Sequence, residues 1–171
     1  MQAVASGHQK AQPVTYRLGT LSNLRLIEVQ VDLARVVRRA IELTEQDFQV
    51  FEGLRDIERQ RELVAKGASR TLDSYHLADR HGQSHAVDLV PFIAGKVQWQ
   101  DGPCITVARA MHKAARLFGV PVTWGGVWDN ELTKLNADDL EGEIDSYVAR
   151  FRKDHGKKPL VDRPHFQVPR S

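Results

Sequence analysis

The sequence has few of the features that would assign it to a specialised class of protein. Its 171 residues include one cysteine, Cys104, so an intramolecular disulfide is excluded. Cys104 lies in an amphipathic segment, which predicts a small buried apolar residue rather than a catalytic thiol. No run approaches the ~20 apolar residues of a membrane span. Residues 1–16 contain no apolar stretch of signal-peptide length. We therefore expect that the protein is made in a cytoplasm and that its export depends on another protein.

The chain also lacks a strong excess of positive or negative charge. The net charge of +2 is too small to indicate nucleic-acid binding by itself. A weakly basic protein can still approach an anionic polymer such as a bacterial cell wall. The length predicts one domain, and there is no repeat or low-complexity tract. We expect a flexible, polar N-terminal arm over residues 1–22 and a single folded domain over residues 23–171.

Helical and strand patterns follow one another without regular βαβ alternation, which indicates an α+β fold. Apolar spacing predicts helices over residues 32–44, 56–66 and 103–118, and an amphipathic helix within 131–158. Strands are predicted over residues 47–51, 86–90, 120–124 and 161–168, with a hairpin turn at 94–96. Pro164 interrupts the last of these strands, so we expect that strand at an edge of the sheet.

Three short segments, residues 74–76, 85–89 and 162–166, carry side chains that suit a metal-activated water. Asp88 lies within an apolar strand, where a carboxylate is costly unless it is paired or metal-bound. A salt bridge to Arg55 is the alternative explanation. Two histidines and an aspartate are the ligands of a zinc site that keeps one position for water. Asp162, three residues before His165, stands where a general base can act, so the pattern indicates a hydrolase.

Four ordered motifs resemble the zinc D-Ala-D-Ala carboxypeptidase-like peptidases, and most of all the L-alanyl-D-glutamate endopeptidases used as phage endolysins. The motifs are Ser74-x-His76, Ala86-x-Asp88, Trp124-Gly125-Gly126-x-Trp128 and Asp162-x-Pro164-His165-Phe166, and Glu52-Gly53-Leu54-Arg55 precedes them. The resemblance runs from about Leu33 to Pro169. It implies that the domain is a zinc peptidase with a D-Ala-D-Ala carboxypeptidase/hedgehog-like fold, in which a small antiparallel sheet carries the zinc site and helices flank it.

The resemblance also implies roles for individual residues. His76, Asp88 and His165 would bind Zn²⁺, and Asp162 would be the catalytic base. Arg55 would bind the substrate's carboxylate or its polarised carbonyl, work that suits a planar guanidinium. The remaining expected substrate-binding or supporting residues are Gln60, Ser74, Trp124 and Trp128. For the two tryptophans, expected to form one wall of the cleft, core packing is the alternative.

The first zinc ligand has two candidates. Members of the family usually have six residues between the first two ligands, whereas eleven separate His76 from Asp88. An insertion over about residues 78–82 would explain this, because loops tolerate added length. His81 has the usual gap but lacks the preceding serine, so we favour His76. We expect His85 to point away from Asp88, because neighbours on a strand face opposite sides.

Two other departures from the family pattern concern the end of the chain. Residues 129–161 form a longer connection than expected, which would be a lid, a wall-contacting surface or a packing helix. Gln167 stands where many relatives place an acid.

We therefore expect a monomeric, Zn²⁺-dependent peptidase of bacterial peptidoglycan, with no nucleic-acid partner. It would be an endolysin that cuts the L-Ala–D-Glu bond for host lysis. It would accumulate in the host cytoplasm and reach the cell wall through a holin. The alternatives are a D-Ala-D-Ala carboxypeptidase of wall remodelling and a non-catalytic wall-binding module.

Overall fold

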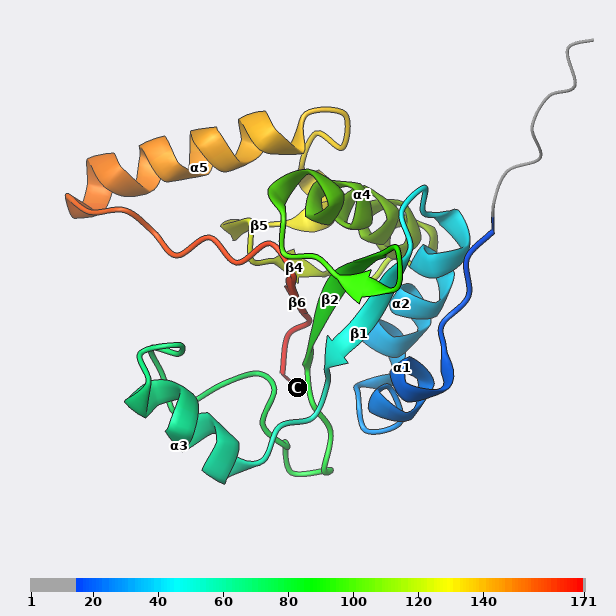
Figure 1. Cartoon of the computed structure of the whole chain (residues 1–171). Helices are drawn as coiled ribbons and strands as arrows, with labels where there is room; N and C mark the ends of the chain where they lie inside the picture. The colour runs from blue at the N-terminus through cyan, green and yellow to red at the C-terminus, as the bar shows by residue number, and fades with distance from the viewer. Residues whose placement is uncertain (1–14, 171) are drawn as a thin grey trace, which may run out of the picture.

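A single antiparallel sheet with the strand order β1-β2-β6-β4-β5 forms the centre of the protein, and β3 pairs with the end of β2 (Figure 1). The computed structural model describes residues 15–170. The strands are β1 (Phe48–Glu52), β2 (Ala86–Ile93), β3 (Lys96–Val97), β4 (Thr123–Trp124), β5 (Val127–Glu131) and β6 (His165–Gln167). The helices are α1 (Thr20–Arg25), α2 (Val31–Leu43), α3 (Ile57–Ala65), α4 (Asp101–Phe118), α5 (Leu140–His155) and a 3₁₀ turn at Leu132–Lys134. The expected α+β class is confirmed.

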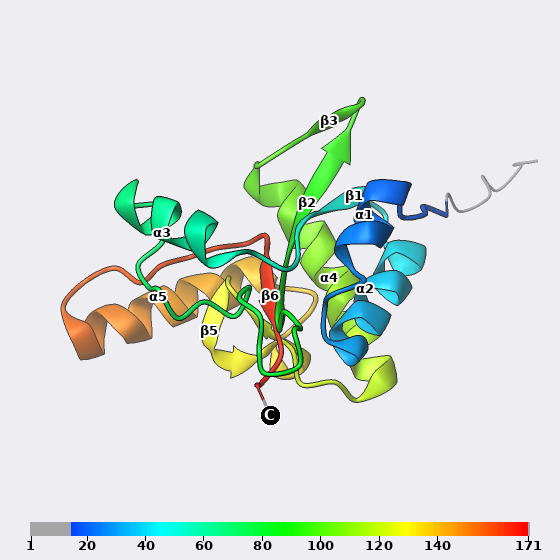
Figure 2. The same cartoon turned by 90° about the horizontal axis from the view of Figure 1, so that it is seen from below.

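Helices α2 and α4 cover one side of the sheet, and α3 and α5 project on the other side (Figure 2). Most of the apolar positions that predict α2 are buried, namely Leu33, Val36, Val37, Ala40 and Ile41, whereas Leu43 is partly buried. On the strands, the alternation of side chains separates core from site. Val87 and Leu89 of β2 belong to the main core, whereas Asp88 between them faces the other side. The sheet therefore has one packed face and one face that is free to carry chemistry.

The predicted helix at residues 103–118 is confirmed, although α4 begins two residues earlier, at Asp101. Pro103 therefore lies in the first turn, where no helical partner needs its missing N–H. Gly119 ends the helix with φ +65°, a left-handed conformation that glycine adopts without steric cost. The predicted turn at 94–96 is also present and joins β2 to β3.

The expected edge position of the last strand is wrong. β6 lies inside the sheet, paired with both β2 and β4. The strand is also shorter than predicted and starts at His165, after Pro164. The proline therefore needs no ladder N–H, and its carbonyl accepts a hydrogen bond from Leu89 N at 2.8 Å. The proline marks the start of an inner strand rather than an exposed edge.

The expected arm over residues 1–22 falls mostly outside the described residues. Within the described part, Thr20 begins α1 and Ser22 is buried. The Ser22 hydroxyl accepts a hydrogen bond from Val50 N of β1 at 3.1 Å. Helix α1 is therefore attached to the domain through Ser22, whereas Thr20 and Leu21 are exposed.

The long connection at residues 129–161 contains α5, which is predicted by its apolar stripe. Leu140, Ile144 and Tyr147 are buried, and α5 packs beside β5 and α4. This is the arrangement of a packing helix. Across residues 15–170, no helix combines the length and apolarity that crossing a membrane requires.

Candidate metal centre and active site

Three side chains from distant parts of the chain meet on the open face of the sheet. Nε2 of His76 lies 3.2 Å from Oδ1 of Asp88 and 3.2 Å from Nδ1 of His165. Nδ1 of His165 lies 3.1 Å from the same Asp88 oxygen. The three residues form a group that can hold a metal ion. Both histidines are buried, whereas the Asp88 side chain keeps 18 % of its surface exposed, so the centre is reached from the Asp88 side.

His76 is held by the loop that precedes β2. Its Nδ1 lies 2.8 Å from the carbonyl oxygen of Gly53, which can only accept, so this nitrogen carries the proton. Its backbone carbonyl accepts a hydrogen bond from Arg55 N at 2.9 Å. The lone pair of Nε2 is therefore directed at the centre, in the tautomer that a metal ligand requires.

His165 is oriented by a neighbour on its own strand. Residues two apart on a strand share a face, and Nε2 of His165 lies 3.0 Å from Oε1 of Gln167. With the amide oxygen as acceptor, Nε2 carries the proton and Nδ1 faces Asp88 and His76. Gln167 can thus do the orienting work for which many relatives are expected to use an acid.

Asp88 stays ionised within this cluster. Burial opposes its charge, but the imidazoles of His76 and His165, with their hydrogen bonds, outweigh burial and hold the pKa of Asp88 below its usual range. The same carboxylate holds the pKa of His165 above its usual value against the opposing effect of burial. A carboxylate that remains charged among imidazoles is suited to bind a cation.

The centre fits a zinc-like ion. Nitrogen and oxygen ligands about 2.0–2.2 Å from a tetrahedral Zn²⁺ lie roughly 3.3 Å from one another. The three ligand atoms here are 3.1–3.2 Å apart. Two histidines and one carboxylate would leave a fourth position for water or substrate. The donor set and its spacing therefore suit a catalytic first-row metal.

Arg55 lies at the edge of the metal cluster, 3.7 Å from Oδ2 of Asp88. It pairs with Glu52, and its Nη1 donates to Oε1 of Gln60 at 2.6 Å. Gln60 is the buried residue of α3 and donates in turn to the Thr71 carbonyl at 2.6 Å. Because Gln60 is completely buried, it positions the guanidinium rather than lining the surface that a substrate reaches.

Asp162 is held beside the centre by the glycine pair after β4. Asp162 N donates to Gly125 O at 2.8 Å, and Gly125 N donates to His165 O at 2.9 Å. A Cβ at Gly125 would lie 2.2 Å from the Asp162 carbonyl oxygen, so a side chain there would displace this segment. Burial and the nearby Asp88 carboxylate raise the pKa of Asp162. A carboxylate with a raised pKa is suited to accept a proton.

The two tryptophans lie in different environments. Trp128 is half-buried and its ring centroid is 5.2 Å from that of His165, so it borders the centre. Trp124 is completely buried, stacks on Phe166 and donates to the Arg163 carbonyl at 2.7 Å. Trp124 therefore packs in the core, as in the alternative weighed for it. Ser74 accepts a hydrogen bond from His76 N at 3.3 Å and so supports the loop of His76.

The structure places His76, and not His81, at the centre. His81 is exposed, and its Nε2 accepts from Arg80 at 2.9 Å. The extra residues form a turn around Asp79, whose Oδ1 accepts from His81 N at 2.8 Å and from Gln83 N at 2.9 Å. The other Asp79 oxygen lies 2.9 Å from Nε2 of His85, which points away from Asp88 as expected. Residues 79–83 therefore form a hydrogen-bonded turn, and His76 still reaches Asp88 across the eleven residues between them.

Two hollows have none of the three candidate metal ligands among their lining residues. The larger, about 710 Å³, lies beside α2 and contains no site residue among its lining side chains, which include Tyr16, Arg38 and Ile41. The smaller, about 300 Å³, lies between β5 and α5 and is bordered by the indole of Trp128. The three candidate metal ligands lie on the open sheet face and line neither of these two hollows.

Comparison with known proteins identifies the family. A family model of phage L-alanyl-D-glutamate peptidases matches residues 14–147. The chain belongs to this family. It is 29 % identical over 149 residues to the L-alanyl-D-glutamate peptidase of Escherichia phage T5, covering 86 % of this chain and all of that relative. The crystal structure of the Serratia marcescens L-Ala D-Glu endopeptidase ChiX superposes with a TM-score of 0.66 at 35 % identity, covering 91 % of each chain. The expected family and fold are confirmed.

Sequence reasoning named Glu52, Gly125 and Gln167 within or beside the motifs but did not predict the contacts by which each supports the site. Glu52 pairs with Arg55, and this carboxylate three positions before an arginine is a signal that was available. Gln167 orients His165, which its position two residues along the strand allows. The close approach of Gly125 to Asp162 left no signal in the sequence, because it joins segments 37 residues apart.

Proposed function

We propose that this peptidase is a Zn²⁺-dependent endolysin that cuts the L-Ala–D-Glu bond of peptidoglycan stem peptides. The observation that carries the proposal is the meeting of His76 Nε2, Asp88 Oδ1 and His165 Nδ1 at distances of 3.1–3.2 Å. The names of the phage T5 and Serratia relatives support the choice of bond. The weakly basic chain also suits an anionic polymer.

The protein's own residues divide the work of hydrolysis. A bound zinc supplies Lewis acidity and makes water acidic enough to react near neutral pH. Asp162 accepts the proton of the attacking water and passes it to the nitrogen of D-Glu as the C–N bond breaks. Arg55 stabilises the negative charge that develops on the L-Ala carbonyl oxygen, held for this by Glu52 and Gln60. The products are a new L-Ala carboxylate and a free D-Glu amine.

The proposed biological role is lysis of a bacterial host. We propose that the enzyme acts as a monomer, accumulates in the host cytoplasm and reaches the wall when a holin opens the inner membrane. The T5 relative, a phage protein, supports this assignment.

Mass spectrometry of digested muropeptides tests the bond. A new amino terminus at D-Glu supports the proposal, and loss of a terminal alanine would instead indicate a D-Ala-D-Ala carboxypeptidase. Binding to purified wall with no cleavage in the presence of zinc would indicate a wall-binding module.

The metal is tested with matched histidine variants. We expect one zinc per chain in the wild type and in His81→Ala, and loss of both metal and activity in His76→Ala. A chelator should abolish lysis, and added zinc should restore it. Full activity of Asp88→Ala or His165→Ala would contradict the proposed mechanism.

A further inference from the structure

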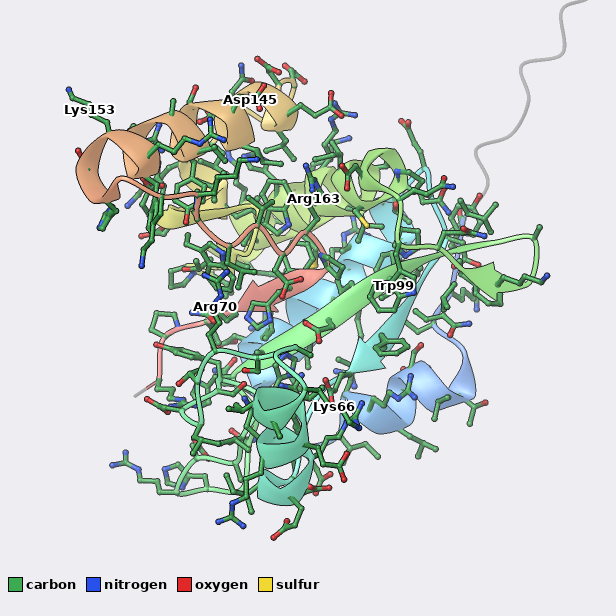
Figure 3. The ribbon with its side chains drawn as sticks, turned by 60° about the vertical axis from the view of Figure 1, so that its left-hand side comes forward. Lys66, Arg70, Trp99, Asp145, Lys153 and Arg163 are labelled. Atoms are coloured by element: carbon green, nitrogen blue, oxygen red, sulfur yellow. The ribbon has the colours of Figure 1, made fainter. Side chains whose placement is uncertain are left out.

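Two aromatic side chains form an exposed pair beside the proposed active site. The rings of Phe51 and Trp99 meet edge to face, with centroids 5.0 Å apart. Phe51 is 41 % exposed and Trp99 is 55 % exposed. Rings of this size usually bury most of their surface, so an exposed pair indicates a contact surface. Figure 3 shows Trp99 in front of β2, on the face of the sheet opposite α2.

The strand register places this pair close to the metal centre. Phe51 precedes Glu52, which lies opposite Asp88 in the pairing of β1 with β2, and a register irregularity between Val50 and Glu52 interrupts the alternation of faces at Phe51. Adjacent Cα atoms are 3.8 Å apart and paired strand residues about 5 Å apart, so the Cα atoms of Phe51 and Asp88 lie within about 9 Å. The aromatic pair therefore lies close to the proposed metal centre.

An ion pair also connects the segment of Trp99 to the segment of Asp162. Asp101, two residues after Trp99, forms an ion pair with Arg163 at 3.0 Å. Arg163 directly follows Asp162, the proposed base. Both ends of the aromatic pair are thus anchored to segments that carry site residues.

The arrangement of Arg55 and Asp162 gives the bound substrate a direction. Asp162 is held next to β4 through Gly125, so the leaving D-Glu nitrogen lies on that side. Arg55 is held beside β1 by Glu52, so the L-Ala carbonyl lies on the β1 side. With the leaving nitrogen placed towards β4, the acyl part of the substrate, which leads back from L-Ala, extends the other way, towards β1 and so towards Phe51 and Trp99.

We propose that Phe51 and Trp99 form a subsite that stacks against the muramyl sugar to which the stem peptide is attached. This proposal rests on the proposed cleavage of the L-Ala–D-Glu bond. In peptidoglycan, L-Ala is joined through a lactyl group to that sugar, so the ring lies roughly 7–8 Å from the scissile carbonyl, about two residue lengths. The apolar C–H face of a pyranose ring packs well on an exposed indole. The cation of Arg25 lies over the Phe51 ring, 5.9 Å from its centroid, and so helps to hold that ring.

The test compares two substrates that differ only in the sugar. One is a disaccharide-linked stem peptide, and the other is the same peptide without sugar. For the wild-type zinc enzyme we expect a lower KM for the sugar-linked substrate. Trp99→Ala should raise that KM on the order of tenfold, as loss of one stacked ring does, and should leave KM for the free peptide unchanged. Trp99→Tyr should restore most of the difference.

Leu117→Ala is the matched control, because Leu117 is 62 % exposed at the other end of α4. It should change neither KM. Equal wild-type KM values for the two substrates would overturn the subsite, and this measurement does not depend on any variant folding. An equal effect of Trp99→Ala on both substrates would also overturn it, in favour of a structural role. Failure of the wild type to cut either substrate would refute the proposed function instead.

Discussion

The side-chain amide oxygen of Gln167 lies 3.0 Å from Nε2 of His165, while Nδ1 of the same ring faces Asp88 at 3.1 Å. The two ring nitrogens of His165 therefore have different roles. One donates to an acceptor on the same strand, and the other is free to bind a cation. The ring orientation depends on this neighbour.

Removing the acceptor should therefore weaken metal binding. Gln167→Ala should lower zinc affinity by about 10–100-fold, the usual effect of losing a partner that orients a ligand. Gln167→Glu, which retains an acceptor, should bind zinc at least as tightly as the wild type. Competition with a chromophoric chelator measures both. Unchanged affinity in Gln167→Ala would show that the ring is held by packing alone.

Arg55 should not be replaceable by lysine. Its guanidinium reaches Glu52, Gln60 and Asp88 at once, and a single ammonium cannot reproduce this geometry. Arg55→Lys should lower kcat/KM by about a hundredfold or more, as removal of one charge-stabilising donor does. The control is Arg59→Ala, an exposed arginine paired with Glu62 on α3, which should retain activity. Steady-state kinetics on a soluble muropeptide distinguish the two variants.

The two tryptophans should respond differently to truncation. Trp124→Ala removes a fully buried ring and should lower the free energy of unfolding by about 3–5 kcal/mol. Trp128→Ala removes a half-buried ring beside His165 and should mainly lower activity. Chemical denaturation and kinetics separate these effects. A larger stability loss in Trp128→Ala than in Trp124→Ala would reverse the assignment.

The turn around Asp79 should make stability depend on acid pH. Hydrogen bonds from Gln83 N and His85 hold the pKa of Asp79 well below its usual range. A carboxyl group with a lowered folded-state pKa stabilises the fold above its unfolded value of about 3.9, and this contribution is lost as pH falls. Asp79→Ala should therefore melt below the wild type at pH 7, and the gap in Tm should narrow below pH 4. Asp145→Ala, an exposed change on α5, should show no such gap.

Local patterns predicted most of the elements, because their causes lie within a few residues. The apolar spacing of α2 and the Pro103 and Gly119 signals of α4 needed no tertiary information. The position of β6 was predicted wrongly, because strand order is set by pairings between distant segments. Pro164 correctly indicated where a strand begins, but it was interpreted as evidence for a strand at the edge of the sheet.

Some residues of the candidate site could likewise be predicted from the sequence, and others could not. Residue types together with the family resemblance selected Asp88, Asp162 and His165 as candidates. The choice between His76 and His81 depended on how the turn around Asp79 folds, which spacing alone left open. The role of Trp124 could be assigned only once its packing against Phe166 was known, because an indole can lie either in a core or at the wall of a cleft.

The inner position of β6 has a consequence for folding during synthesis. Until a growing chain extends to residue 167, β2 and β4 have no strand between them, and the sheet exists as two unjoined pieces with bare edges. The strand that joins them also delivers His165 to His76 and Asp88. Closure of the sheet and assembly of the proposed metal centre are therefore one event, so we expect a polypeptide that ends before His165 to be inactive. If the enzyme has the proposed role in host lysis, its activity is thereby tied to completion of the fold.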